Sequence, residues 1–282
     1  MSAASTAVAP RRVRRPLRAL VWVRRHLLDV YALLALTYLF LPISVVIAFS
    51  FNNPLGRFNY TWQGFTFRNW LNPLDYPGLS GALRVSIEIA LLSSLVATLL
   101  GTLIALALVR YRFRGSSTTN LLIFVPMTTP EIVMGASLLT LFLNWKIPQG
   151  FGTILIAHVA FNISYVVVTV RARLVGFDRH LEEAAMDLGA NEIVTFLRVT
   201  LPLIAPGILA ASLLAFALSI DDFVITYFNA GTTTTFPLFV WGAARVAVPP
   251  QINVVGTAIF AVAVGGMLAN VLLQNRRTRR SA

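Results

Sequence analysis

Long apolar runs constrain the fold of this chain more than any other feature of its sequence. Each run approaches the length of about 20 residues that a helix needs to cross the hydrocarbon core of a bilayer. There are six, at about 31–51, 84–109, 120–144, 153–171, 203–228 and 254–274. A water-soluble core cannot bury this much apolar surface in 282 residues, of which 57% are hydrophobic and 12% are charged. The sequence therefore predicts an all-α integral membrane protein with six transmembrane helices.

The same pattern predicts the domain organisation. One transmembrane domain is expected over residues 31–275, after a basic segment 1–30 and before a short tail 276–282. Of the 23 basic residues, 18 lie in these two ends or in the connections after the second and fourth runs. The positive-inside rule places all four regions, and so both termini, in the cytoplasm. Because this placement accounts for the net charge of +12, we expect contact with lipid and no nucleic-acid partner.

The sequence also excludes several kinds of chemistry. It has no cysteine, which rules out a disulfide framework and a thiolate metal site. It has no Gly-x-x-x-x-Gly-Lys-Ser/Thr loop, the pattern that cradles nucleotide phosphates. We therefore expect no catalytic residue, no metal and no cofactor on this chain.

The connection between the fourth and fifth runs has a regular pattern, which indicates two short helices over residues 179–200. Gly189 suits the left-handed position that ends a helix, Asn191 can cap the next helix, and Pro202 begins the fifth run. Glu183 and Asp187 share one face, where anionic lipid would repel them and a basic protein groove would suit them. The opposite face carries apolar residues at helical spacing: Leu181, Ala184, Ala185 and Leu188. We therefore expect a cytoplasmic protein to bind this segment.

This segment also fits a long gapped pattern, made of Glu183-Ala184-Ala185, Gly189, Val199 and Leu201-Pro202. The pattern resembles the EAA motif of permease subunits of ABC importers, which usually have isoleucine in place of Val199. The resemblance implies a type I ABC importer permease (MetI-like) fold in a bacterial inner membrane. It also implies that the 179–200 helices insert into a groove on a cytoplasmic ATPase. The ATPase-coupling residues would be Glu182, Glu183, Ala184, Ala185, Asp187, Leu188, Gly189, Leu201 and Pro202.

The resemblance further implies a set of partners. These are a homologous second permease subunit, two cytoplasmic ATPase subunits that bind the ATP, and a periplasmic or other extracytoplasmic solute-binding protein. The chain itself would be a transporter subunit and not an enzyme, since ATP hydrolysis would reside on the ATPase.

Other segments resemble the spermidine/putrescine-type permeases: residues 48–67, Pro130-Glu131-Ile132-Val133, Ser219-Ile220-Asp221-Asp222-Phe223, Phe236-Pro237-Leu238, Arg245 and Pro250-Gln251-Ile252-Asn253. They favour a polyamine as the solute. Permeases for opines, aminoethylphosphonate and amino-acid-like solutes share these features, so another small solute stays open. The run Thr232–Thr235 differs from the Gly-Pro turn of the family, which leaves the shape of that outer loop undetermined.

Three carboxylates are candidates for a substrate pathway: Glu131, Asp221 and Asp222. An acid inside the hydrocarbon costs about 2.5–3.5 kcal/mol on insertion scales, so it usually faces a cavity or a partner, which a cationic solute could be. Glu131 follows Pro126 and Pro130, which predict a break in the third run, and a straight helix would put it about 15 Å deep. Alternatively, Glu131 bonds another helix and the aspartates cap the outer gate. Of the two aspartates, Asp221 is preferred.

The two long outer connections, 52–83 and 229–253, are rich in aromatic residues. They predict either an interfacial aromatic belt or a docking surface for the extracytoplasmic partner, formed by Trp62, Phe65, Trp241 and Arg245. Two rivals from other classes are a proton-coupled secondary carrier with Glu131 as its relay and a membrane scaffold without transport. Both leave the pattern at 182–202 unexplained.

Overall fold

The computed structural model describes the backbone of residues 18–111 and 113–280, and the side chains of residues 26–111, 113–266 and 268. Residues 1–17 of the predicted basic segment, Arg112, and residues 281–282 of the predicted tail lie outside the described residues. The described chain forms helices and no strand, as predicted. The elements are α1 (Arg18–Ser50), α2 (Arg68–Leu71), α3 (Leu79–Arg110), α4 (Ser116–Thr128), α5 (Glu131–Asn144), α6 (Phe151–Val175), α7 (His180–Asp187), α8 (Glu192–Thr195), η1 (Phe196–Thr200), α9 (Leu201–Ile220), α10 (Val224–Asn229), α11 (Phe236–Val246) and α12 (Pro250–Arg280).

In the described part of the chain, four helices are long and apolar enough to cross a membrane: His26–Ser50, Leu79–Arg110, Phe151–Val175 and Glu192–Ile220. A fifth span results if α4 and α5 are counted together. The sixth predicted run falls in α12, where the described apolar stretch, Pro250–Gly266, is shorter. The helical membrane architecture is therefore present, and the described residues account for four or five of the six predicted spans.

Two of the predicted spans are broken. The third bends by 110° between α4 and α5, at the position where Thr129 is extended and Pro130 lacks a backbone donor. The predicted break is confirmed. The expected depth of about 15 Å for Glu131 was calculated for a straight helix, so it does not apply to the bent span. The fifth predicted run stops as a regular helix at Ile220 and resumes as the short helix α10.

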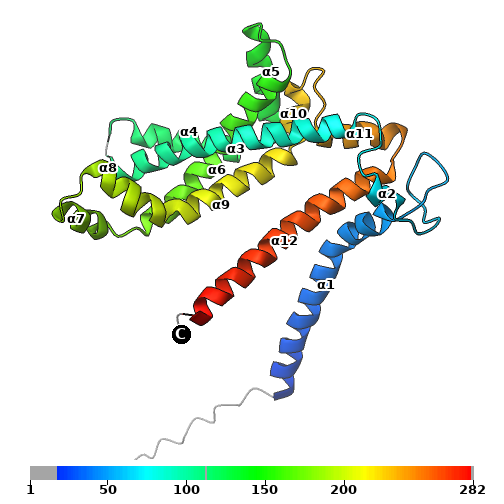
Figure 1. The fold of residues 1–282 in the computed structure, drawn as a ribbon, viewed down its shortest axis with the longest axis horizontal. Coiled ribbons are helices and arrows are strands. Elements are labelled where there is room, and N and C mark those ends of the chain that lie inside the picture. Colours follow the sequence, from blue (N-terminus) through cyan, green and yellow to red (C-terminus); the bar gives the residue numbers. More distant parts are fainter. Residues whose placement is uncertain (1–17, 112, 281–282) are drawn as a thin grey trace, which may run out of the picture.

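The core lies where α3, α6 and α9 pack side by side, with α4 against α6 and α10 against α5 and α6 (Figure 1). It is built from small and β-branched side chains, whose fit allows the helices to approach closely. Its buried members include Ala97, Ala105, Val166, Val167, Val170, Ile204, Ala211 and Ala215. Helices α7 and α8 lie at one end of this bundle, and α2 and α11 lie at the opposite end (Figure 1).

Helices α1 and α12 pack on each other and diverge from the bundle (Figure 1). The most apolar stretch of α1 is not buried against any described part of this chain. Lipid or another subunit must therefore cover these apolar side chains, since water would not be a tolerable neighbour.

Gly101 lies where α3 packs tightly against α6. A Cβ at this position would lie 2.6 Å from Cγ1 of Val166 and 3.3 Å from the carbonyl oxygen of Ile163. Glycine is thus required here by space, as at other close helix crossings in membranes.

Replacing Gly101 with alanine is expected to destabilise the folded chain by about 1–3 kcal/mol, because α3 and α6 must separate to admit the methyl group. Gly81→Ala on the same helix is the control, since a Cβ there meets nothing within 4 Å. It should be neutral or stabilising by up to about 1 kcal/mol, the difference in helix propensity. Thermal unfolding in detergent measures the stability of both variants. Equal loss of stability in Gly101→Ala and Gly81→Ala would contradict the packing argument.

Candidate functional site

The segment between α6 and α9 is two short helices, as its sequence predicts. Gly189 has φ +91°, the left-handed conformation expected at the end of α7. The side-chain oxygen of Asn191 accepts a hydrogen bond from the amide of Val194 at 2.9 Å, which caps α8. Helix α8 continues through the π-helical η1 into α9, so Glu192–Ile220 is one continuous helix, with Pro202 in the first turn of α9.

Most residues predicted to couple to an ATPase lie on the outside of this segment. Leu188 is 90% exposed, and Leu181, Ile193 and Leu197 are also exposed, so the apolar stripe faces away from the chain. Ala184, Asp187, Gly189 and Pro202 are exposed, while Ala185 and Leu201 are half-buried. A large apolar surface beside acids at the end of the bundle has the composition of a protein contact.

The adjacent acids Glu182 and Glu183 face different surroundings. Glu183 is exposed and accepts a hydrogen bond from Nδ1 of His180 at 3.0 Å. This bond, with the nearby charge of Asp178, raises the pKa of His180 above its ordinary value. Glu182 instead points into the chain, where it pairs with Arg110 and accepts from the hydroxyl of Thr200. Glu182, which the resemblance counts among the coupling residues, therefore does not share the exposed face of Glu183.

The three predicted pathway acids occupy separate positions. Glu131 is exposed as the first residue of α5, beside the 110° bend, and Asp221 is exposed at the end of α9. The Asp222 side chain is only 6% exposed. It accepts hydrogen bonds from the amide and the hydroxyl of Thr226, both at 2.8 Å, and so caps α10. In the described part of the chain, no hydrogen bond or ion pair joins these acids to one another. Asp222 therefore bonds the start of α10 within this chain, and its role at the outer gate stays a prediction.

A buried histidine that the sequence analysis did not single out holds Asp222 in place. His158 in α6 is 3% exposed, and its Nε2 lies 3.2 Å from Asp222 and 2.9 Å from the hydroxyl of Thr226. Its Nδ1 lies 2.7 Å from the hydroxyl of Ser219, which accepts from the hydroxyl of Ser93 at 2.9 Å. This polar network therefore connects α3, α6, α9 and α10. An ionisable residue inside an apolar run is the signal that could have identified it.

One turn further along α6, Asn162 is fully buried. Neither polar atom of its amide has a hydrogen-bond partner in the described structure. An asparagine inside a membrane helix either lines a pathway or bonds a neighbouring helix. Within the described residues it makes no such bond.

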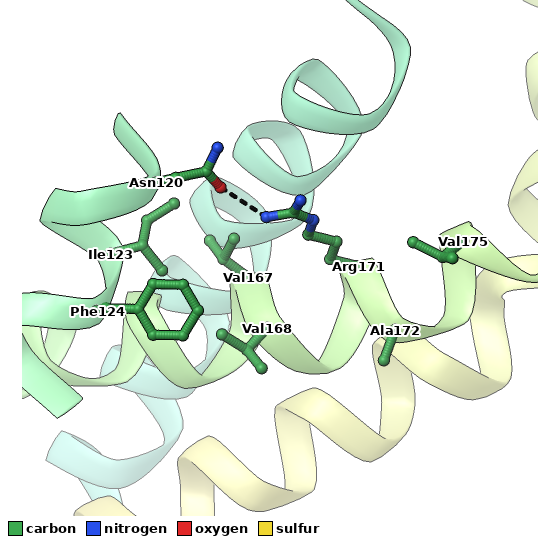
Figure 2. A pocket seen from close by; sticks show the side chains of 8 residues that line it. All are labelled: Asn120, Ile123, Phe124, Val167, Val168, Arg171, Ala172 and Val175. Atoms are coloured by element: carbon green, nitrogen blue, oxygen red, sulfur yellow. Dashed lines mark hydrogen bonds between the residues drawn. The ribbon is translucent and has the colours of Figure 1, made fainter. Parts of the chain in front are cut away.

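A pocket of about 590 Å³ opens between α4 and α6. Figure 2 shows its lining side chains: Asn120, Ile123, Phe124, Val167, Val168, Arg171, Ala172 and Val175. Nη1 of Arg171 donates to Oδ1 of Asn120 at 2.6 Å (Figure 2). The lining contains a guanidinium and no carboxylate, so its charge is unsuited to a cationic solute. None of the predicted pathway acids belongs to this pocket.

The first outer connection is held together by a buried asparagine. The amide nitrogen of Asn52 donates to Asn59 and to the carbonyl of Thr61, and its oxygen accepts from the amides of Gln63 and Gly64. Main-chain hydrogen bonds from Asn59 and to Arg57 tie this loop to Val248, near the start of α12. The two outer connections are therefore one structural unit.

The predicted docking residues lie on this outer unit. Trp62 and Phe65 are exposed, and Phe65 stacks on Phe51 with ring centroids 5.4 Å apart. On α11, the guanidinium of Arg245 lies 4.8 Å from the ring centroid of Trp241. Trp241 also contacts Phe223 beside the two aspartates, at 5.2 Å between centroids. The loop between α1 and α2, which carries Trp62 and Phe65, and helix α11, which carries Trp241 and Arg245, both lie at the end of the molecule opposite α7 (Figure 1).

The threonine run that differs from the family follows a glycine turn. Gly231 has φ +55°, and a Cβ there would lie 2.8 Å from the carbonyl oxygen of Gln149. The amide of Thr233 closes the turn on the carbonyl of Ala230 at 2.9 Å. The turn is therefore packed against the chain just before α6.

Comparison with known proteins agrees with this architecture. The chain is 39% identical to the spermidine/putrescine transport system permease protein PotC of Escherichia coli K12, over 86% of this chain and 91% of PotC. It is 38% identical to the putrescine transport system permease protein PotI of the same organism, over 89% and 92%. A solved bacterial ABC transporter that imports the acidic polysaccharide alginate has the same fold, with a TM-score of 0.63 and 18% identity over 90% of this chain and 96% of that one.

Residues 97–280 match the family described as the binding-protein-dependent transport system inner membrane component. This match covers most of the bundle and the whole α7–α8 segment, which carries the EAA pattern. The apolar helices agree with a multi-pass protein of the inner membrane. The chain therefore belongs to the family of inner-membrane components of binding-protein-dependent transport systems and is a permease subunit of an ABC importer.

Proposed function

We propose that this chain moves a polyamine, of the spermidine or putrescine kind, across the bacterial inner membrane with energy from ATP. The observation that carries the proposal is the identity of 39% to PotC and 38% to PotI, extending over nearly the whole of each permease. The alternative solutes are an opine, aminoethylphosphonate or an amino-acid-like molecule. The experiments below distinguish these solutes from a polyamine.

The assembly proposed for this function has four kinds of partner. A second, homologous permease subunit and lipid would cover the apolar faces of α1 and α12. Two cytoplasmic ATPase subunits would bind the ATP and hold α7 through Leu188 and Glu183. A solute-binding protein would dock outside on Trp62, Phe65, Trp241 and Arg245. This arrangement requires both termini to be cytoplasmic, in agreement with the distribution of arginines.

Within the membrane, Asp221 is the acid best suited to meet a cationic solute. Its carboxylate is exposed, whereas Asp222 is already occupied by Thr226 and His158. Exposed aromatic side chains of Tyr227 and Trp241 lie on the segments that follow, and aromatic faces attract ammonium groups. Glu131, exposed at the bend of the third span, is a second candidate. A proton-coupled carrier with Glu131 as its relay is disfavoured by the family to which the chain belongs.

Uptake of labelled putrescine and spermidine by the assembled complex in proteoliposomes tests the proposal. Asp221→Asn is expected to lower uptake about tenfold, which corresponds to a loss of about 1.4 kcal/mol of attraction for the cation, and Glu131→Gln is expected to lower it less. Asp75→Asn removes an exposed acid from the outer connection and should leave uptake unchanged. If the Asp221→Asn, Glu131→Gln double variant keeps full uptake, these two acids do not form part of the substrate pathway.

Two further arms separate the alternatives. Uptake that persists without ATP but stops with an ionophore would indicate a secondary carrier. Ligand identification on the binding protein would decide between a polyamine and another small solute.

A further inference from the structure

The contacts that hold α7 lead to α3, although the chain reaches α7 directly from α6. Glu182 pairs with Arg110 at the end of α3. Nη2 of Arg179, the residue before α7, donates to the carbonyl oxygen of Val109 at 2.9 Å. Two side chains of the α7 region are therefore bound to the last turn of α3, where free carbonyls attract cations.

The Arg110–Glu182 pair differs from an ordinary surface ion pair. Its side chains are 27% and 17% exposed, whereas those of the Arg84–Glu88 pair are 80% and 42% exposed. The hydroxyl of Thr200 also contacts both Glu182 and Arg110, at the start of α9. Partial burial and a third partner reduce the solvent screening that makes exposed pairs weak.

At its other end, α3 contacts the outer parts of the molecule. Near the middle of α3, the hydroxyl of Ser93 donates to Ser219, a member of the His158–Asp222 network, at 2.9 Å. The hydroxyl of Ser86 accepts from the amide of Phe236, the first residue of α11, at 2.8 Å. Between these points α3 packs along α6 and α9, and its 32 residues extend for about 48 Å. One uninterrupted helix thus connects the α7 region to the outer network and to α11.

We propose that the Arg110–Glu182 pair fastens α7 to α3, so that α3 carries the movement of the ATPase-bound segment to the outer side of the membrane. The inference rests on the proposed ATPase coupling. It assigns Glu182 a positioning role, distinct from the docking role of the exposed Glu183 and Leu188. If the pair is broken, the ATPase should stay bound to α7. The movement of the ATPase should then no longer reach the membrane spans.

The first test measures coupling in the assembled complex. Glu182→Gln and Arg110→Gln should each retain bound ATPase but raise the ATP hydrolysed per solute transported about tenfold, within the range of coupled side-chain pairs. The charge-swapped Arg110→Glu, Glu182→Arg variant should recover most of the loss. Arg84→Gln and Glu88→Gln remove an exposed ion pair from the same helix, at its outer end, and should not change the coupling. Unaltered coupling in Glu182→Gln, or no recovery in the swap, would overturn the proposal.

The second test measures the distance between α7 and α3, and it needs no ATPase. Because the chain has no cysteine, spin labels can be placed at Met186 on α7 and Leu103 on α3, both of which are exposed. The full chain in lipid nanodiscs should give one narrow distance distribution, which broadens in Glu182→Gln and narrows again in the charge swap. A distribution that stays narrow in Glu182→Gln would contradict the fastening. A complex that binds no ATPase while the distances behave as expected would instead contradict the proposed function.

Discussion

Replacing Gly189 with valine is expected to lower solute-stimulated ATP hydrolysis and uptake at least about tenfold, while the chain still inserts in the membrane. At φ +91° a β-branched side chain is strained by at least about 1–2 kcal/mol, so the end of α7 must adopt another conformation. A Cβ at this position meets nothing within 4 Å, which means that the strain arises in the backbone and not from a clash. Refolding of the turn would move Leu188 and Ile193, the exposed apolar residues on either side of it.

The effect of this substitution is large because the turn determines how α7 and α8 are oriented. The amides of Gly189 and Ala190 bond the carbonyls of Met186 and Ala185, at 2.9 and 3.1 Å, and so close the end of α7. We expect uptake to fall at least about tenfold, as for a displaced functional contact. Co-purification with the ATPase and uptake in proteoliposomes are the measurements.

Gly176→Val is the matched control for this experiment. Gly176 also follows a helix on the same side of the molecule and is exposed, but its φ of −88° is accessible to any residue. A Cβ there also meets nothing within 4 Å. Equal losses in the two variants, or full activity in Gly189→Val, would show that the left-handed turn is not needed.

Replacing Asp222 with alanine is expected to destabilise the folded chain by about 3 kcal/mol, because buried groups that lose a hydrogen-bond partner cost about 1–3 kcal/mol each. Two losses combine in this variant. The amides at the start of α10 lose their cap, and His158, which is 3% exposed, loses its carboxylate partner. Asp221→Ala is the control, because that neighbouring acid is exposed and should change stability by no more than about 0.5 kcal/mol.

A double-mutant cycle separates these two losses. Asp222→Ala combined with His158→Leu should cost less than the sum of the single changes by about 1–2 kcal/mol, because no unpaired imidazole then remains in the core. Thermal unfolding in detergent gives the stability of the four proteins in the cycle: the original protein, the two single variants and the double variant. Additive effects would mean that His158 and Asp222 do not stabilise each other, and that α10 depends on the cap alone.

Local chemistry explains why the α7–α8 segment was predictable in detail. Gly189 is recognisable because few other residues adopt positive φ, and Asn191 because its side chain reaches the free amides of the next turn. Both effects act within a few residues. The direction of the adjacent acids could not be predicted in this way, since Glu182 turns inward toward Arg110, which is 72 positions earlier in the chain.

The pathway acids show the same limit. Pro126 and Pro130 predict a break in the third span, but neither predicts a bend of 110° or the exposure of Glu131 beside it. Asp221 and Asp222 are chemically identical neighbours, and their different roles depend on where α6 places His158. A single histidine in an apolar run indicates a buried polar contact, but its position in the sequence does not show which acid it binds.

The sequence by itself determined the all-α membrane class, the family and the two-helix segment that carries its motif. These follow from hydropathy over about 20 residues and from short-range backbone chemistry, which need no knowledge of neighbours in space. Only the tertiary structure decided which acids are buried, which are exposed, and that α3 connects the α7 region to the outer network. Those features depend on contacts between residues far apart in the chain, and helix packing alone brings such residues together.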